Sequence, residues 1–301
     1  MCSIIGWSGK LPKGLITRLL IKAESRGRDS VGLAFRVNNS NKAYRVACSA
    51  SGFIADKSNG SILSDARRST RGIAHARRAS TGMPIDERNA HPFPYWRYFF
   101  AHNGKIQNWR EIREMLIGYF SSEAKRLREA GKDDQAQTAE YCVGYSQRIT
   151  TDSMVLGPYI EARNFSSIIG CMGLVWLREN NVYVLRYAKE AVAATVIWHN
   201  VKPSEDENTE DHLVTLIAST EQIISGAFEK MTDIEYDISY REFPEGHIFR
   251  VEPTGLVDEG EVQMNKPVED AFTSEIVETA AEQEAELQRE LKDEQQTQVQ
   301  A

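Results

Sequence analysis

The apolar pattern of the chain begins at once, with a short run over residues 2–7 that ends at the Ser8-Gly9 pair. A short apolar run bounded by a turn signal predicts a buried β-strand. Apolar residues then recur at helical spacing over residues 15–23, and Gly27 is well suited to end a helix. The chain is therefore expected to open with a strand that starts at its second residue and to continue into an amphipathic helix.

Most of the other apolar segments have the length and composition of strands. Residues 31–37 and 42–47 flank the turn-forming sequence Asn-Asn-Ser-Asn, which predicts a β-hairpin. Further strands are expected at residues 72–76, 98–102, 168–177, 182–187, 213–218 and 247–251, and helices at residues 109–116, 153–162 and 221–228. Strands joined by hairpins, with helices clustered between groups of strands, indicate an α+β layered fold with mainly antiparallel sheets.

Length and composition are those of a globular protein, because 301 residues of which 41% are apolar can fill a sizeable core. No stretch approaches the roughly 18 uninterrupted apolar residues of a membrane span, and the start of the chain lacks a basic region followed by an apolar run. Cys2, Cys48, Cys142 and Cys171 lack the spacing of a disulfide framework or a zinc site. We therefore expect a cytoplasmic protein, neither exported nor membrane-embedded, that holds no metal.

Two segments look like additions to this core. Residues 121–145 are polar and charged, and residues 267–301 form an acidic tail rich in Gln and Glu. The tail carries ten acidic and two basic residues, so the net charge of −7 for the whole chain leaves the rest near +1. With a net charge this close to zero, the chain without its tail has no strong positive electrostatic field to attract nucleic acid or an anionic membrane. We expect the main domain to cover residues 2–257, and the tail to be dispensable for its chemistry and to serve partner docking or solubility.

The most reactive candidate residue is Cys2, which follows the initiator methionine directly. Removal of Met1 would leave a thiol and a free α-amine on one residue. An α-amine titrates at about 7.7–8.0, so it can take the thiol proton at neutral pH, through a bridging water, without a histidine partner. The alternative is that Cys2 is a small core residue beside Ile4 and Ile5. Position alone does not decide between the two, but the motifs that follow Cys2 favour the nucleophile.

These motifs occur in the order found in a known family. The chain resembles the glutaminase domain of glutamine–fructose-6-phosphate aminotransferase, a class II glutamine amidotransferase of the N-terminal-nucleophile type. The matching segments are residues 1–6 (Met-Cys-Ser-Ile-Ile-Gly), 26–30 (Arg-Gly-Arg-Asp-Ser), 75–82 (His-Ala-Arg-Arg-Ala-Ser-Thr-Gly), 89–92 (Asn-Ala-His-Pro), 102–104 (His-Asn-Gly), 151–153 (Thr-Asp-Ser) and 217–219 (Ile-Ala-Ser). The resemblance covers roughly residues 2–257. It implies a four-layer αββα sandwich and a thiolate of Cys2 that attacks the glutamine side-chain amide, forms a γ-glutamyl thioester and releases ammonia.

The resemblance also implies a pocket for free glutamine. Arg77 offers a planar fork that can bind an α-carboxylate through two hydrogen bonds, and Asp152 can accept the α-ammonium group. Ser80 would help to hold the glutamine backbone. The alternatives are that Arg77 is one solvated charge in the basic stretch of residues 67–78 and that Asp152 is a helix N-cap, a role compatible with ammonium binding.

Asn103 and Gly104 follow an apolar strand and match the family's oxyanion hole. A side-chain amide and a backbone N–H can converge there on the oxygen of a tetrahedral intermediate, and removal of one such donor typically costs about a hundredfold to a thousandfold in turnover. The alternative is that Asn-Gly forms a tight turn, which is its commonest use.

Three residues depart from the family's pattern: Ser3 replaces a glycine, Arg78 a tryptophan and Thr81 a histidine. The rim of the pocket is therefore expected to differ. Beyond residue 257 no site for an ammonia acceptor is recognisable, and the chain contains no nucleotide-binding glycine motif. We expect no cofactor, glutamine as the substrate, and a separately encoded synthase as the partner that accepts ammonia.

Other functions stay open at this point. A stand-alone glutaminase, or an amidase for γ-glutamyl compounds, would use the same thioester without an acceptor enzyme. A non-catalytic module that senses glutamine would fit the altered rim and the acidic tail, and would keep Met1. A peptidase is disfavoured because Arg77 and Asp152 together would select a free amino acid. A nucleic-acid binder resting on residues 67–78 is disfavoured because the aromatic residues nearby are expected in a core strand.

Overall fold

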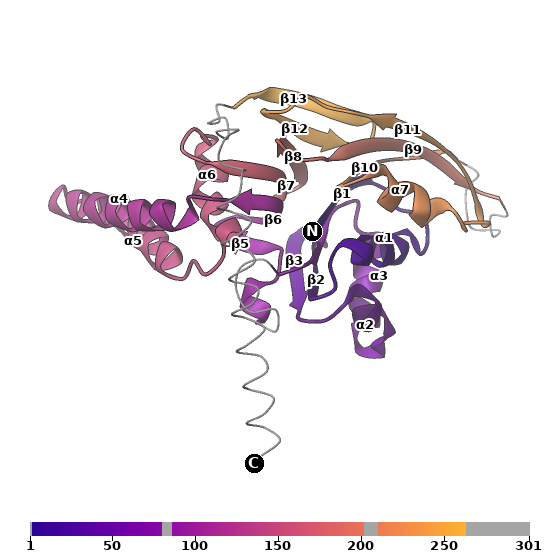
Figure 1. The fold of residues 1–301 in the computed structure, drawn as a ribbon, viewed down its shortest axis with the longest axis horizontal. Coiled ribbons are helices and arrows are strands. Elements are labelled where there is room, and N and C mark those ends of the chain that lie inside the picture. The colour runs from indigo at the N-terminus through magenta and orange to yellow at the C-terminus, as the bar shows by residue number, and fades with distance from the viewer. Residues whose placement is uncertain (1, 80–85, 202–209, 263–301) are drawn as a thin grey trace, which may run out of the picture. The chain divides into compact units, whose positions relative to one another are not determined.

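The computed structural model describes residues 2–79, 86–201 and 210–262. They form two β-sheets with helices beside each (Figure 1). Every strand pair in the two sheets is antiparallel, which confirms the predicted α+β class. Ser80, Thr81 and the acidic tail lie outside the described residues.

The first sheet has seven strands in the order β11-β9-β10-β1-β4-β2-β3. Its bounds are β1 (Ser3–Gly9), β2 (Ser30–Val37), β3 (Ser40–Val46), β4 (Arg71–Arg77), β9 (Val192–Asn200), β10 (His212–Ala218) and β11 (Ile234–Arg241). The predicted opening strand is confirmed, and it lies in the middle of this sheet between β10 and β4. The predicted hairpin is formed by β2 and β3.

The second sheet has six strands in the order β13-β12-β8-β7-β6-β5. Its bounds are β5 (Phe93–Tyr95), β6 (Tyr98–Ile106), β7 (Gly170–Arg178), β8 (Asn181–Tyr187), β12 (His247–Glu252) and β13 (Gly255–Glu261). The sequence predicted β6, β7, β8 and β12 but not β5 or β13. Strand β6 also continues four residues past the predicted end at residue 102.

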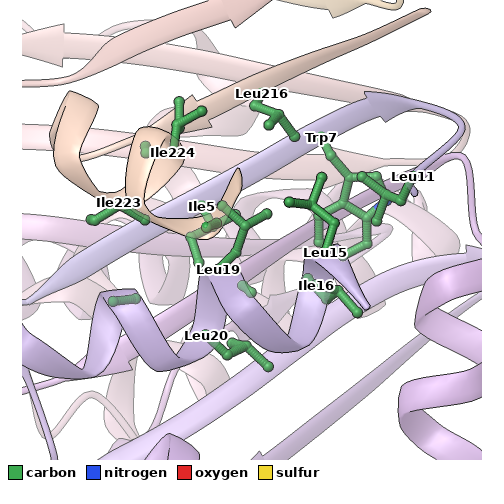
Figure 2. Packing of buried hydrophobic residues seen from close by; sticks show 14 of the residues in the cluster. Ile5, Trp7, Leu11, Leu15, Ile16, Leu19, Leu20, Leu216, Ile223 and Ile224 are labelled. Atoms are coloured by element: carbon green, nitrogen blue, oxygen red, sulfur yellow. The ribbon is translucent and has the colours of Figure 1, made fainter. Parts of the chain in front are cut away.

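Alternation along β1 explains how the layers stack, because successive side chains of a strand point to opposite faces. Ile5 and Trp7 pack with α1 (Leu15–Ala23) and α7 (Glu221–Phe228) in one cluster (Figure 2). This cluster also takes in residues of α2 (Ala50–Ala55) and α3 (Gly60–Arg68). Ile4, on the opposite face of β1, packs in a separate cluster with residues of the second sheet such as Val175. The first sheet is therefore covered by helices on one face and by the second sheet on the other.

The outer face of the second sheet is covered by α4 (Trp109–Glu129), α5 (Asp133–Gln147) and α6 (Leu156–Ala162). The three apolar clusters thus separate four layers, in the order helix, sheet, sheet, helix, as the resemblance implied. Within the described residues, no helix is long and apolar enough to cross a membrane.

The segment of residues 121–145 completes α4 and forms most of α5, so the predicted helix end at residue 116 was wrong. The two helices pack against each other at their far ends through a small cluster of their own. Its members are Ala124, Leu127, Ala136 and Ala139. Arg128 adds ion pairs with Asp133 and Glu140 across the connection. The apolar side of α4 therefore continues past residue 116, where it faces α5.

Candidate active site

Three of the predicted site residues occupy the same end of the two sheets. Cys2 directly precedes β1 and lies on the face of Ile4, which packs between the sheets. Arg77 is the last residue of β4, and by alternation it shares the face of Ile73. Asn103 lies in β6 of the second sheet on the inward face. The sequence thus brings a thiol, a guanidinium and an amide from three strands to one end of the space between the sheets.

Cys2 is half-buried, and its thiol donates a hydrogen bond to the backbone carbonyl oxygen of Arg78 at 3.3 Å. The backbone carbonyl oxygen of Cys2 accepts a hydrogen bond from Arg26 Nε at 3.3 Å. Burial raises the pKa of the Cys2 thiol above its ordinary value, while the contact with Arg78 and the positive charge of Arg77 act in the opposite direction. The thiol therefore needs a base to ionise readily at neutral pH.

Arg77 and Asp152 are both buried, at 3% and 5% exposure. Burial lowers the pKa of Arg77, and the negative charges of Cys2, Asp29 and Asp152 raise it. Asp152 Oδ2 accepts a hydrogen bond from the Ile106 N–H at 3.0 Å, at the end of β6. This contact fixes the carboxylate beside the other site residues. Asp152 is the first residue of a short 3₁₀ helix whose N-cap is Thr151, so the alternative role of Asp152 as an N-cap is wrong.

Asn103 and Gly104 lie inside β6 and not in a tight turn, because the strand continues to Ile106. Asn103 is 2% exposed, and its side-chain N–H₂ donates to Ser219 Oγ at 3.0 Å. A Cβ at position 104 would lie 2.0 Å from the backbone oxygen of Cys171. Only glycine fits there, because the neighbouring strand β7, which contains Cys171, approaches too closely for a side chain. The alternative reading of this pair as a turn is therefore wrong.

A second group of residues holds the backbone that leaves β4. Asp29 accepts a hydrogen bond from the Ala79 N–H at 2.7 Å, and its own N–H donates to the Arg77 carbonyl oxygen at 2.9 Å. A Cβ at Gly27 would lie 2.4 Å from the carbonyl carbon of Arg77. Residues 27–29 therefore support the segment that leads to Ser80, which itself lies outside the described residues. The sequence matched these residues to a family motif but gave them no role.

No family model matches the chain. Curated relatives do match, and among them is the glutamine–fructose-6-phosphate aminotransferase of Listeria monocytogenes, which is 38% identical over 120 residues. The same enzyme of Caulobacter vibrioides is also 38% identical over 120 residues. Over this segment the chain is homologous to the N-terminal region of these aminotransferases. The match covers 39% of this chain but only 19% of either relative, so the chain spans about a fifth of the length of these proteins.

Solved structures agree with this homology at the level of the fold. The glutamine phosphoribosylpyrophosphate amidotransferase of B. subtilis aligns with a TM-score of 0.51 and 14% identity, over 86% of this chain and 49% of its own. A structure described as the allosteric regulatory enzyme of purine biosynthesis aligns with a TM-score of 0.52 and 15% identity, over 86% of this chain and 48% of its own. The chain therefore has the N-terminal-nucleophile fold of the amidotransferases.

One departure from the amidotransferase pattern has a structural explanation. Ser3 is fully buried, and its Oγ donates to the backbone carbonyl oxygen of Ala23 at 3.2 Å, at the end of α1. It points to the helix layer, on the opposite face of β1 from Cys2. Ser3 therefore does not reshape the space between the sheets. Thr81 lies outside the described residues, and Arg78 has an exposed side chain.

Three buried histidines lie next to these candidate site residues. The rings of His75 and His91 have centroids 4.0 Å apart, and His75 Nε2 lies 3.1 Å from the His102 carbonyl oxygen. His102 Nδ1 lies 2.9 Å from Ser153 Oγ. Burial lowers the pKa of all three, that of His75 to about 3. Within the described residues, no group of three or more His, Cys, Asp or Glu side chains is arranged to hold a metal. The three histidines are neutral packing elements at physiological pH.

Proposed function

We propose that this chain is the glutamine-hydrolysing part of an amidotransferase, with Cys2 as its nucleophile after removal of Met1. The observation that carries the proposal is the convergence of Cys2, Arg77 and Asn103 from three strands on one end of the space between the sheets. The homology to glutamine–fructose-6-phosphate aminotransferases supports the same chemistry.

Recognition of glutamine falls to the two buried charges. Arg77 forms two parallel hydrogen bonds with the α-carboxylate, and Asp152 accepts one from the α-ammonium group. Both charges are almost fully buried, so their interactions with a ligand are strengthened by the low local dielectric constant. A peptide lacks at least one of the two free groups and therefore binds poorly.

The reaction begins when the α-amine of Cys2 takes the proton from the thiol, through a water molecule. The sulfur then attacks the side-chain carbonyl carbon of glutamine and forms a tetrahedral oxyanion. The Asn103 side-chain amide and the Gly104 N–H donate to this oxygen. The carbon–nitrogen bond breaks, the nitrogen takes the proton and leaves as ammonia, and water then hydrolyses the γ-glutamyl thioester to glutamate. No cofactor enters any of these steps.

The fate of the released ammonia distinguishes an amidotransferase coupled to a synthase from a stand-alone glutaminase. We propose that the ammonia passes to a separate synthase protein, since the relatives of this chain are named as aminotransferases, which deliver the nitrogen of glutamine to an acceptor. A stand-alone glutaminase would carry out the same hydrolysis without a partner. Co-purification with a synthase, and glutaminase activity that rises in its presence, would support the coupled form.

The proposed function is tested by combining intact-mass measurement with the variant Cys2→Ala. Wild-type protein should have lost Met1 and should gain one adduct from a glutamine-analogue electrophile. Cys2→Ala should release no ammonia from glutamine while its fold is retained, because the α-amine remains but the nucleophile is gone. Cys48→Ala, which removes another half-buried thiol, is the matched control and should retain wild-type activity. Ammonia release by Cys2→Ala at a near wild-type rate, or retention of Met1 in active protein, would refute the proposal.

A further inference from the structure

Ser219 ties the strand of the nucleophile to the strand of the proposed oxyanion donor. It directly follows β10 and is fully buried. Its Oγ accepts one hydrogen bond from the Ile4 N–H and one from the Asn103 side-chain N–H₂, each at 3.0 Å. Its own N–H donates to the Ile4 carbonyl oxygen at 3.2 Å. One residue thus joins the first sheet, two positions after Cys2, to the second sheet at Asn103.

The hydrogen-bonding capacity of these groups determines what the contact does. A serine hydroxyl has two acceptor lone pairs, and both are occupied here, by Ile4 and by Asn103. The Asn103 side chain has two N–H donors, of which Ser219 takes one. The second N–H is then directed by the geometry of the planar amide and is left for a ligand.

The orientation of this amide matters because its terminal torsion is intrinsically broad and roughly twofold. Without a fixed acceptor, the Asn103 amide can turn over and present its oxygen in place of its N–H. An oxygen facing the developing oxyanion repels it, whereas an N–H stabilises it. An acceptor that is itself anchored to the backbone of Ile4 prevents this rotation.

We propose that Ser219 is a positioning residue for glutamine hydrolysis, which holds the Asn103 amide with its free N–H toward the oxyanion and at a set distance from Cys2. This inference rests on the proposed function. Ser219 touches neither substrate nor the reacting atoms, and it acts through Asn103. Loss of its hydroxyl should therefore weaken stabilisation of the transition state more than binding of glutamine.

The first test is steady-state glutaminase kinetics of Ser219→Ala. Deletion of an oxyanion donor costs about a hundredfold to a thousandfold in kcat, and a donor that is still present but free to rotate should cost less. We expect kcat to fall about 10-fold to 100-fold, with KM for glutamine within about threefold of wild type. Ser8→Ala removes an equally buried hydroxyl from β1 and should leave both constants unchanged.

The second test separates action through Asn103 from a general disturbance of the site. In an Asn103→Ala background, Ser219→Ala should change kcat by less than about threefold, because the group it positions is already gone. Alkylation of Cys2 by iodoacetamide, followed by peptide mass, forms no tetrahedral oxyanion. Its rate in Ser219→Ala should therefore stay within about twofold of wild type.

Three results would overturn the inference. The first is a wild-type kcat in Ser219→Ala, and the second is a fall in kcat on adding Ser219→Ala to Asn103→Ala that is as large as in the wild-type background. The third is an alkylation rate of Cys2 that falls in parallel with kcat. If Ser219→Ala does not fold, the near-isosteric pair Ser219→Thr and Ser219→Val isolates the hydroxyl, and Thr should turn over at least about tenfold faster than Val. Equal rates for the pair would also overturn it. Wild-type protein that fails to hydrolyse glutamine would overturn the proposed function together with this inference, so the two failures are distinguishable.

Discussion

Mild acid should destabilise this fold through its buried histidines, well before the carboxylates are protonated. His75 is fully buried, its ring lies 4.0 Å from that of His91, and its pKa is lowered from the ordinary value of 6.5 to about 3. Burial likewise lowers the pKa of His91 and that of His102. A histidine with a lowered native pKa takes up a proton on unfolding, so stability is present above the unfolded pKa and is lost as the pH falls below it.

The magnitude follows from the pKa of His75. Between pH 7 and pH 5 the His75 ring of the unfolded form gains a proton that the folded form does not. Below the ordinary pKa of 6.5, each pH unit lowers the unfolding free energy by about 1.36 kcal/mol. The interval from pH 6.5 to pH 5 therefore lowers it by about 2 kcal/mol. Each further histidine that stays neutral in the folded protein adds as much as about 2 kcal/mol. Because a domain is stabilised by only about 5–15 kcal/mol, this loss is a large part of the total.

Urea unfolding at pH 7, 6 and 5 measures the effect, and the variant His91→Leu assigns it. This variant removes one titrating ring, so the difference in unfolding free energy between pH 7 and pH 5 should shrink by as much as about 2 kcal/mol. Phe93→Leu is the matched control, because Phe93 packs against His91 with ring centroids 4.4 Å apart but does not titrate. It should lower stability equally at all three pH values.

The interval from pH 7 to pH 5 isolates the histidines from the carboxylates. Glu24 and Glu259 have pKa values lowered from 4.5, so the stability they contribute is lost only as the pH falls below that value. An unfolding free energy that is the same at pH 7 and pH 5 would refute the reasoning, as would an unchanged pH dependence in His91→Leu.

Further predictions concern the binding and oxyanion groups. Arg77→Lys should raise the KM for glutamine at least about tenfold with little change in kcat, because a point charge cannot reproduce two parallel hydrogen bonds. Asn103→Ala should instead lower kcat about a hundredfold to a thousandfold with little change in KM, and equal KM effects in the two variants would contradict their separate roles. Gly104→Ala should destabilise the fold by more than about 2 kcal/mol in urea unfolding, since its Cβ would meet the Cys171 carbonyl oxygen at 2.0 Å. Wild-type stability in that variant would show that β6 and β7 can separate there.

The elements that the sequence predicted well are those with both faces buried or a strong helical period. Strand β1 is buried throughout, and α7 repeats its apolar residues at helical spacing, so both were recognised. The edge strands β11 and β13 were missed because they are largely exposed and carry many charged and polar residues. The edge strand β3 was predicted because a turn signal links it to β2. Helix α5 was missed because its buried positions are mostly small or polar, such as Ala136 and Ser146. Its partner is α4, which local periodicity does not reveal.

The candidate site was predicted from the order of its motifs, whereas its supporting contacts depend on tertiary structure. The residue types at Cys2, Arg77 and Asn103 allowed both a chemical and a structural role, and the order of the motifs favoured the chemical one. Nothing in the sequence indicates that Ser219, distant along the chain, accepts from Asn103, or that Asp152 accepts from the end of β6. Such contacts are set by the register of strands that meet only in the folded chain.

The central place of β1 has a consequence for biosynthesis. Ile5 of β1 pairs with Ala218 of β10, so β1, which directly follows Cys2, cannot form this pairing until the ribosome has added more than 200 further residues. At about 5–20 residues per second this interval is on the order of 10 to 40 s. During it Cys2 is exposed on a nascent chain in which neither Ile4 nor Asn103 is anchored by Ser219. Under the proposed function, glutamine hydrolysis should therefore reach its full rate only after translation has passed β10.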